Sequence, residues 1–211
     1  KSVAAGIGAG IALSAQESTL VIDVGAGVTE VAVVALGMAT VVRSVPFGGV
    51  DVDEAIRKFI WRRAGITLSR AAAEDLKLRV RAVEPALAGN DLDLSEIGPP
   101  SVDTRIDAAE VALVMAEALE PLIDEVAWVV EHLAPKQRAE ISQNGGVLTG
   151  GGALLQGLPQ LLEARIGVPL RVAEDPLAAT VLGLRAIAGD LKHIPLDGEL
   201  RVHLGIHGRT V

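Results

Sequence analysis

Two glycine-rich turns are the parts of this sequence best suited to chemistry. The first lies in Asp23–Glu30, which reads DVGAGVTE and separates two apolar runs. A glycine turn between strands exposes consecutive backbone amides, which can hold an anion such as phosphate. Asp23, at the end of a buried strand, could hold Mg²⁺ through water, because Mg²⁺ takes oxygen ligands and keeps several waters. Glu30 could orient a water. The simpler alternative is a hairpin with a capping aspartate and a surface glutamate.

The second turn contains three consecutive glycines, Gly150 to Gly152, after a short apolar run. Glycines at the end of a strand let a flat ligand approach the backbone closely. The alternative is a flexible connection from a strand to a helix. The first turn is neither a Walker loop nor a dinucleotide fingerprint, because in those motifs the glycine loop leads into a helix and here it leads into a strand.

The elements around the first turn are predicted from periodicity. Apolar runs at 19–24, 29–36 and 39–45 predict three strands with short connections, which form a β-meander. Helical spacing of apolar residues predicts a helix over 51–64, stopped by Gly65. Ser69 can cap a further helix that runs to about Val80 and carries Lys77.

The second half of the chain predicts alternating helices and strands. Residues 84–100 are irregular and predict a loop with one hairpin. Asp107 caps a helix over 108–119, and Pro121 begins a separate helix over 121–132. Further segments are predicted at 3–12, 135–141, 158–166 and 178–188 (helices) and at 147–149, 170–173 and 199–207 (strands). This alternation indicates an α/β fold.

The composition narrows the function classes. The chain has 211 residues, half of them hydrophobic but only 2% aromatic, so Val, Leu, Ile and Ala must build the core. A net charge of -8 disfavours nucleic acid and anionic membranes as partners. The absence of cysteine excludes disulfides and thiolate metal sites. We expect a cytoplasmic protein without a leader or a membrane span. The opening Lys1 suggests a fragment or a truncated relative.

Taken together, the two turns resemble the second phosphate loop and the adenosine loop of MreB and its actin relatives. The segments that carry the resemblance are Ala4–Gly10, Val21–Val33, Phe47–Gly49, Gly146–Leu155, Gly167–Leu170 and Ala173–Leu177. The resemblance covers residues 3 to 190. It implies the C-terminal half of an actin-like (ribonuclease H-like) α/β ATPase domain, with a mixed sheet flanked by helices and an inserted smaller α+β subdomain. The implied core comprises residues 1–68 and 143–190, the insertion 69–142, and a tail or the start of a further element 191–211.

The resemblance also implies a ligand, ATP or ADP with Mg²⁺. Asp23 would lie near the metal, Lys77 would contact the purine or ribose, and Glu30 would be a catalytic residue. The phosphates would be wrapped by Gly25, Ala26, Gly27 and Val28, and the adenosine faced by Gly150, Gly151, Gly152 and Ala153. The chain departs from the family pattern at Ala26, Val28 and Arg79, and it lacks the family's first phosphate loop.

Several functions stay open on the sequence alone. The first is a bacterial cytoskeletal protein that binds ATP and assembles into or onto filaments. The second is an actin-like scaffold without ATPase activity, favoured by the missing half and by Val28 and Arg79. The third, a sugar kinase or Hsp70-type protein, fits the residues after Gly150 less well. We expect self-association or a separate N-terminal half as partners, no nucleic acid, and no direct membrane anchor in this chain.

Overall fold

A five-stranded mixed sheet organises the computed structural model, which describes residues 1–95 and 104–191. The strand order is β3-β2-β1-β6-β7. The strands are β1 (Thr19–Val24), β2 (Thr29–Ala35), β3 (Met38–Val45), β6 (Gly146–Thr149) and β7 (Leu170–Val172). The first three form an antiparallel meander, which confirms the prediction, and β6 and β7 run parallel to β1. The sheet therefore brings the ends of β1 and β6 to one edge.

The inner strands are buried on both faces, as their nearly continuous apolar sequences require. Leu20 and Ile22 of β1 belong to a large core on one face, and Val21 belongs to a smaller core on the other. Asp23 pairs with Glu30 of β2 and with Thr149 of β6. Because side chains alternate along a strand, these three polar side chains share the face of the smaller core.

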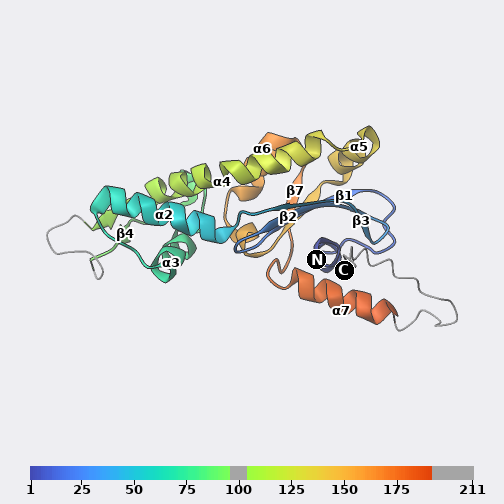
Figure 1. Ribbon diagram of the computed structural model, residues 1–211, viewed down its shortest axis with the longest axis horizontal. Coiled ribbons are helices and arrows are strands. Elements are labelled where there is room, and N and C mark those ends of the chain that lie inside the picture. Colours follow the sequence, from blue (N-terminus) through green and yellow to red (C-terminus); the bar gives the residue numbers. More distant parts are fainter. Residues whose placement is uncertain (96–103, 192–211) are drawn as a thin grey trace, which may run out of the picture.

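Helices cover both faces of the sheet (Figure 1). On the large-core face lie α4 (Ala108–Glu131), α5 (Pro135–Asn144) and α6 (Leu158–Ile166). On the other face, α1 (Ser2–Gly8) and α7 (Ala179–Leu191) pack against each other. The expected α/β fold, a mixed sheet flanked by helices, is confirmed.

A helical region extends beyond one end of the sheet (Figure 1). It contains α2 (Gly49–Ala64), α3 (Arg70–Val80), the 3₁₀ turn η1 (Pro85–Leu87) and the short ladder of β4 (Leu92–Asp93) and β5 (Arg105–Ile106). α2 packs on α3 and on α4. The predicted caps are confirmed: Ser69 Oγ accepts from the Ala72 amide at 3.1 Å, and Gly65 adopts a left-handed conformation after α2. The division of the chain at 68 and 142 stays a prediction.

The two helices predicted on either side of Leu119 are in fact one, so the boundary at Pro121 is wrong. α4 continues through Pro121. A proline inside a helix leaves the carbonyl four residues earlier without its amide donor. Here that carbonyl belongs to Glu117, and both residues lie on the exposed face, where water can replace the donor. Buried Leu119 and Leu122 continue the apolar face across the proline.

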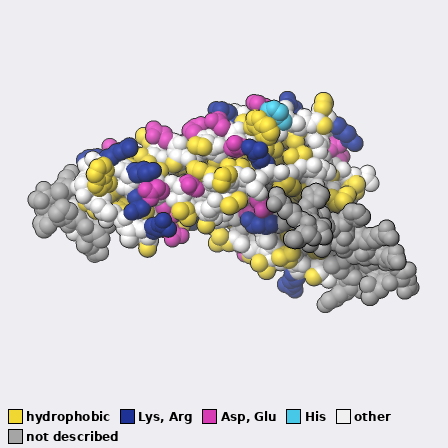
Figure 2. Space-filling model, viewed as in Figure 1, with side chains coloured by type: hydrophobic (Ala, Val, Ile, Leu, Met, Phe, Trp, Pro, Cys, Tyr) yellow, Lys and Arg dark blue, Asp and Glu magenta, His cyan; other side chains and the backbone are white. Residues whose placement is uncertain are grey.

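Other boundaries also differ from the prediction. The first helix ends at Gly8 rather than at residue 12, and Gly10 follows with a positive φ of 92°. The hairpin expected within 84–100 has its second strand, β5, beyond that range. The strand predicted at 199–207 lies outside the described residues. None of the described helices is both long enough and apolar enough to span a bilayer. Basic and acidic side chains intermingle over the face shown in Figure 2.

The contact between α1 and α7 depends on glycine and yields a stability prediction. A Cβ atom at Gly183 would overlap the Ala4 carbonyl, and one at Gly8 would overlap the Ala179 carbonyl. Gly183→Ala should therefore lower the free energy of unfolding by about 1–3 kcal/mol, the range for overpacking. Gly189→Ala, in the same helix with nothing within 4 Å of its Cβ position, should be neutral or raise it by up to about 1 kcal/mol. Urea unfolding of both variants tests this, and equal losses would contradict it.

Candidate functional site

The two predicted glycine turns lie at one pocket. The first glycine turn (Gly25–Gly27) follows β1, and the second glycine turn (Gly150–Gly152) follows β6 and enters the 3₁₀ turn η2 (Gly151–Leu154). A pocket of about 530 Å³ opens between them and α3. It is lined by Gly25, Ala26, Gly49, Glu74, Lys77, Leu78, Arg81, Gly151, Gly152, Leu154, Leu155 and Leu177.

The first glycine turn is fixed to the start of α2. The Gly49 amide donates to the Gly25 carbonyl at 3.0 Å, and the Val50 amide donates to the Ala26 carbonyl at 2.8 Å. A Cβ atom at Gly48 would lie 2.5 Å from both of these carbonyl oxygens, so only glycine fits there. The amides of Ala26 and Gly27 have no hydrogen-bond partner among the described residues. These two donors are available to a ligand.

The glycines of the second turn differ in what they require. Gly150 has a φ of 81°, and a Cβ atom there would lie 2.6 Å from Asp23 Oδ1. A Cβ atom at Gly152 would overlap the Val24 side chain. Both are therefore needed for packing against β1. At Gly151 the nearest atom to a Cβ would be Leu177 Cδ2 at 3.6 Å, an ordinary contact. Of these three glycines, Gly151 alone is not explained by the chain's own packing.

Lys77 projects from α3 into the pocket wall and forms a buried ion pair. Its Nζ lies 2.8 Å from Asp53 Oδ1 and donates to the Gly49 carbonyl at 3.1 Å. The two side chains are only 12% and 10% exposed. Burial raises the pKa of the Asp53 carboxyl, and the Lys77 ammonium acts in the opposite direction. The pair joins α2 to α3 directly beside the first glycine turn.

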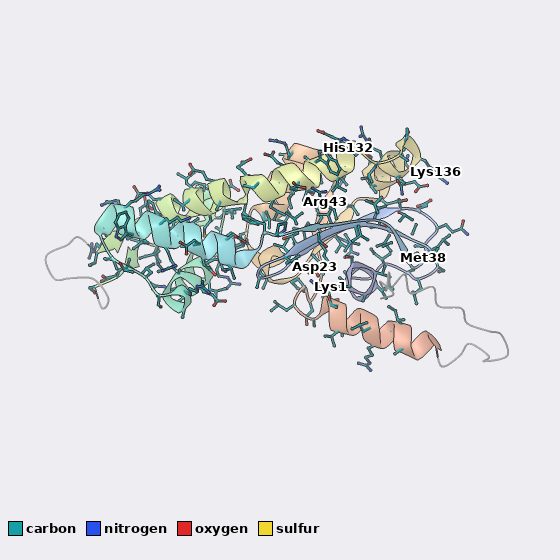
Figure 3. The ribbon with its side chains drawn as sticks, in the orientation of Figure 1. Lys1, Asp23, Met38, Arg43, His132 and Lys136 are labelled. Atoms are coloured by element: carbon teal, nitrogen blue, oxygen red, sulfur yellow. The ribbon has the colours of Figure 1, made fainter. Side chains whose placement is uncertain are left out.

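Asp23 and Glu30 lie behind the turns, on the side of α1. The Lys1 ammonium lies 3.0 Å from Asp23 Oδ2, and Figure 3 shows the two residues next to each other. The Ser2 hydroxyl donates to Glu30 Oε2 at 2.7 Å. Asp23 Oδ2 is thus paired with an ammonium, whereas the hydroxyl of fully buried Thr149 has no hydrogen-bond partner in the described residues. An unpaired buried polar group is costly, so the Thr149 hydroxyl has unused capacity for a water.

The structure brings some of the predicted site residues together and separates others. Gly25, Ala26, Lys77, Gly151 and Gly152 line the pocket. The remaining predicted residues do not line it. Asp23 and Glu30 face α1, and Gly27 and Val28 are exposed beside the pocket. Gly150 packs on β1, and Ala153 is buried in the large core. In the described ranges, no three His, Asp or Glu side chains gather as a metal site would require.

Sequence reasoning missed most of the wall that α3 contributes. Glu74, Leu78 and Arg81 line the pocket together with Lys77. Their spacing of three, four and seven residues places them on one face of a helix. The signal was therefore present once Lys77 had been singled out. The apolar side of the pocket consists of Leu154, Leu155 and Leu177. The sequence alone does not distinguish these leucines from ordinary core residues.

Comparison with known proteins places this geometry in a family. Residues 1–195 match the family described as MreB/Mbl protein. The chain belongs to the MreB/Mbl family. It is 36% identical over 186 residues to the cell shape-determining protein MreB of Escherichia coli K12, an alignment covering 86% of this chain and 53% of that protein. Against the cell shape-determining protein Mbl of Bacillus subtilis 168, identity is 30% over 195 residues, covering 90% and 58%. The chain thus spans a little over half the length of these MreB/Mbl relatives.

Solved structures agree on the fold. MreB5 of Spiroplasma citri bound to ADP matches with a TM-score of 0.81 and 26% identity, over 90% of this chain and 59% of that one. The same protein has also been solved bound to AMPPNP. The MamK double helical filament matches with a TM-score of 0.67 and 22% identity, over 84% and 55%. The actin-like fold expected for this MreB/Mbl chain is confirmed.

The buried ion pair predicts a pH-dependent loss of stability. Because burial raises the folded-state pKa of Asp53, the folded chain binds more protons than the unfolded chain, and stability falls as pH rises through that pKa. Lys77→Met removes the opposing ammonium and raises this pKa further. We expect a loss of about 3 kcal/mol at pH 8 and a smaller loss at pH 5.

Urea unfolding at both pH values measures the effect. The control is Lys136→Met, which removes an exposed pair with Glu140 at 3.7 Å and should cost at most about 0.5 kcal/mol. A Lys77→Met loss that is equal at pH 5 and pH 8 would show that the pair is not an electrostatic one.

Proposed function

We propose that this chain forms one wall of the nucleotide cleft of an MreB-like cytoskeletal protein, which binds ATP or ADP with Mg²⁺ and assembles into filaments. The observation that carries the proposal is the single pocket shared by the two glycine turns and Lys77. Related MreB5 has been solved with ADP and with AMPPNP, and its structure covers nine-tenths of this chain.

The phosphates fit the end of the pocket at the first glycine turn. Two amide donors without partners, those of Ala26 and Gly27, supply hydrogen bonds to an anion. The N-terminus of α2 begins at Gly49 beside them, and its dipole favours negative charge. Lys77 adds a cation at the same place, since its ammonium lies at the Gly49 carbonyl. The overall charge of -8 makes this local concentration of donors and positive charge distinctive.

The sugar and base fit the other end of the pocket. Leu78, Leu154, Leu155 and Leu177 give that end an apolar lining, which suits the faces of a purine. Gly151 offers its backbone without a side chain, so a flat group can lie against it. A nucleotide explains why the chain has glycine at a position where its own packing has room for a side chain.

A magnesium ion fits the corner beside Asp23. The buried Asp23 carboxylate already has the Lys1 ammonium 3.0 Å from its Oδ2, so the position favours a cation. When bound, Mg²⁺ neutralises phosphate charge. Asp23 would hold the ion through water, and Glu30, which accepts from Ser2, would orient a further water.

Assembly and hydrolysis need more than this one wall of the cleft. Stabilising phosphoryl transfer takes groups on more than one side of the phosphate, and this chain offers one side. We propose that the matching half closes the cleft and that the complete protein assembles into filaments in the bacterial cytoplasm, in a cell-shape role like that named for its relatives.

The proposal predicts that Gly151→Val weakens nucleotide binding without unfolding the chain. A valine side chain would enter the pocket, whereas its Cβ atom makes only an ordinary contact with Leu177. Calorimetric titration of ATP with Mg²⁺ should show binding to the wild-type chain and at least about tenfold weaker binding to the variant, as expected when a side chain occupies a ligand's place. The melting temperature without nucleotide should not change.

Two controls sharpen this measurement. Gly189→Ala changes a glycine with nothing within 4 Å of its Cβ position and outside the pocket lining, and should leave ATP binding unchanged. Asp23→Ala should weaken binding with Mg²⁺ more than binding in EDTA. If the wild-type chain binds no ATP at millimolar concentration, the nucleotide proposal fails and a scaffold without nucleotide becomes the better account.

A further inference from the structure

Arg81 has an unusual backbone at the pocket. It is one of two non-glycine residues with positive φ in the described ranges, the other being Leu36 in the turn between β2 and β3. Its φ is 54°, and it caps the C-terminus of α3, a position where glycine or asparagine is usual. An arginine there carries a conformational cost that glycine would not. Strained residues of this kind concentrate at functional sites.

Surrounding hydrogen bonds hold Arg81 in this conformation. Its amide donates to the Lys77 carbonyl at 2.8 Å, and its carbonyl accepts from the Gln156 amide at 2.8 Å. The Val83 amide then donates to the Gln156 carbonyl at 2.9 Å. These bonds explain why the backbone turns here. They do not explain why the side chain is arginine.

The Arg81 guanidinium has no partner among the described residues. It lines the pocket, and it has no ion pair or hydrogen bond with any other described side chain or backbone group. By contrast, Lys77 on the same helix face is already paired with Asp53. Arg79, on a different face, lies 3.9 Å from Asp75. Of the two cations that line the pocket, Arg81 is therefore the one available to a ligand.

The position of Arg81 assigns it to the base end of the pocket. It lies one helical turn beyond Lys77, which reaches the phosphate end through the Gly49 carbonyl. Its own backbone is bonded to Gln156, the residue after Leu155. Arg81 thus lies beside the apolar stretch that follows the second glycine turn, at the opposite end of the pocket from the first.

We infer that Arg81 reads the edge of the nucleotide base and favours guanine over adenine, an inference that rests on the proposed nucleotide function. A guanidinium has five donors and no acceptor. Guanine presents two adjacent acceptors, O6 and N7, which match this fork. At the same edge, adenine presents one acceptor, N7, beside an amino group. The amino group and the guanidinium are both donors, so they cannot hydrogen-bond to each other. A purine with a carbonyl at position six is therefore the better ligand.

The experiment compares GTP, ITP and ATP, each with Mg²⁺, by calorimetric titration of the wild-type chain and of Arg81→Gly. ITP keeps O6 and N7 but lacks the 2-amino group. The wild-type chain should bind GTP and ITP alike and ATP more weakly, by a factor of about five or more, the lower end for a bidentate arginine contact. Arg81→Gly should lose this preference, with the loss falling on GTP and ITP.

Two further measurements separate this role from a structural or general electrostatic one. Arg81→Gly should melt at the same or a higher temperature without nucleotide, because glycine tolerates the left-handed conformation. Arg79→Gln removes an equal charge outside the pocket and should preserve the ratio of GTP to ATP affinity.

The outcomes distinguish the inference from the function beneath it. If Arg81→Gly weakens all three nucleotides equally, or if the wild-type chain prefers ATP, base recognition by Arg81 is wrong while nucleotide binding stands. If GTP binds well but ITP does not, the 2-amino group is what the pocket reads, and the inference is overturned. If no nucleotide binds, the proposed function itself fails.

Discussion

The parallel pairing of β1 with β6 is the constraint on which the rest of the site depends. It sets Asp23 beside Thr149, so that the chain leaves both strands at the same edge of the sheet. Ligand sites in sheets with parallel strands gather at the carboxyl ends of those strands. The glycine turns that follow can then approach each other only because the second one packs directly on the end of β1. Gly150 packs against Asp23 and Gly152 packs against Val24, so neither glycine position has room for a side chain.

The glycines in and beside these turns are of two kinds, those that packing requires and those that it does not. Gly48, Gly150 and Gly152 are required by neighbouring atoms of the chain itself. Gly27 and Gly151 have space for a side chain and ordinary backbone angles, so folding alone does not select them. A glycine-rich run therefore gives weak evidence of binding when it is read as a whole. The evidence becomes strong at the positions where the fold would accept a larger residue and the sequence still has glycine.

Much of this arrangement could be predicted from the sequence because local chemistry determines it. The strand over 19–24 and the helix over 158–166 have the predicted bounds, since an apolar run ending at Gly25 marks the strand and Gly157 and Gly167 flank the helix. The break placed at Pro121 was wrong because tertiary packing overrode the local signal: buried Leu119 and Leu122 hold α4 against the core across the proline. Of the site, the turns and Lys77 were predictable. The Asp53 partner and the position of Arg81 depend on how α2 and η2 pack against α3, which no local pattern encodes.

Lys77 shows why structural and binding roles are difficult to separate in this fold. Its ammonium lies at the pocket wall, yet it also neutralises a buried carboxylate and bonds the backbone at the start of α2. Removing it would disturb the start of α2, where the amides of Gly49 and Val50 hold the first glycine turn. Loss of binding after such a change would not show that Lys77 touches a ligand. Arg81 differs in this respect, since its side chain supports nothing else in the described chain and its backbone would be relieved by glycine. The backbone at Arg81 is strained, and its side chain contacts no partner among the described residues. Ligand binding in the pocket therefore explains this arginine better than folding does.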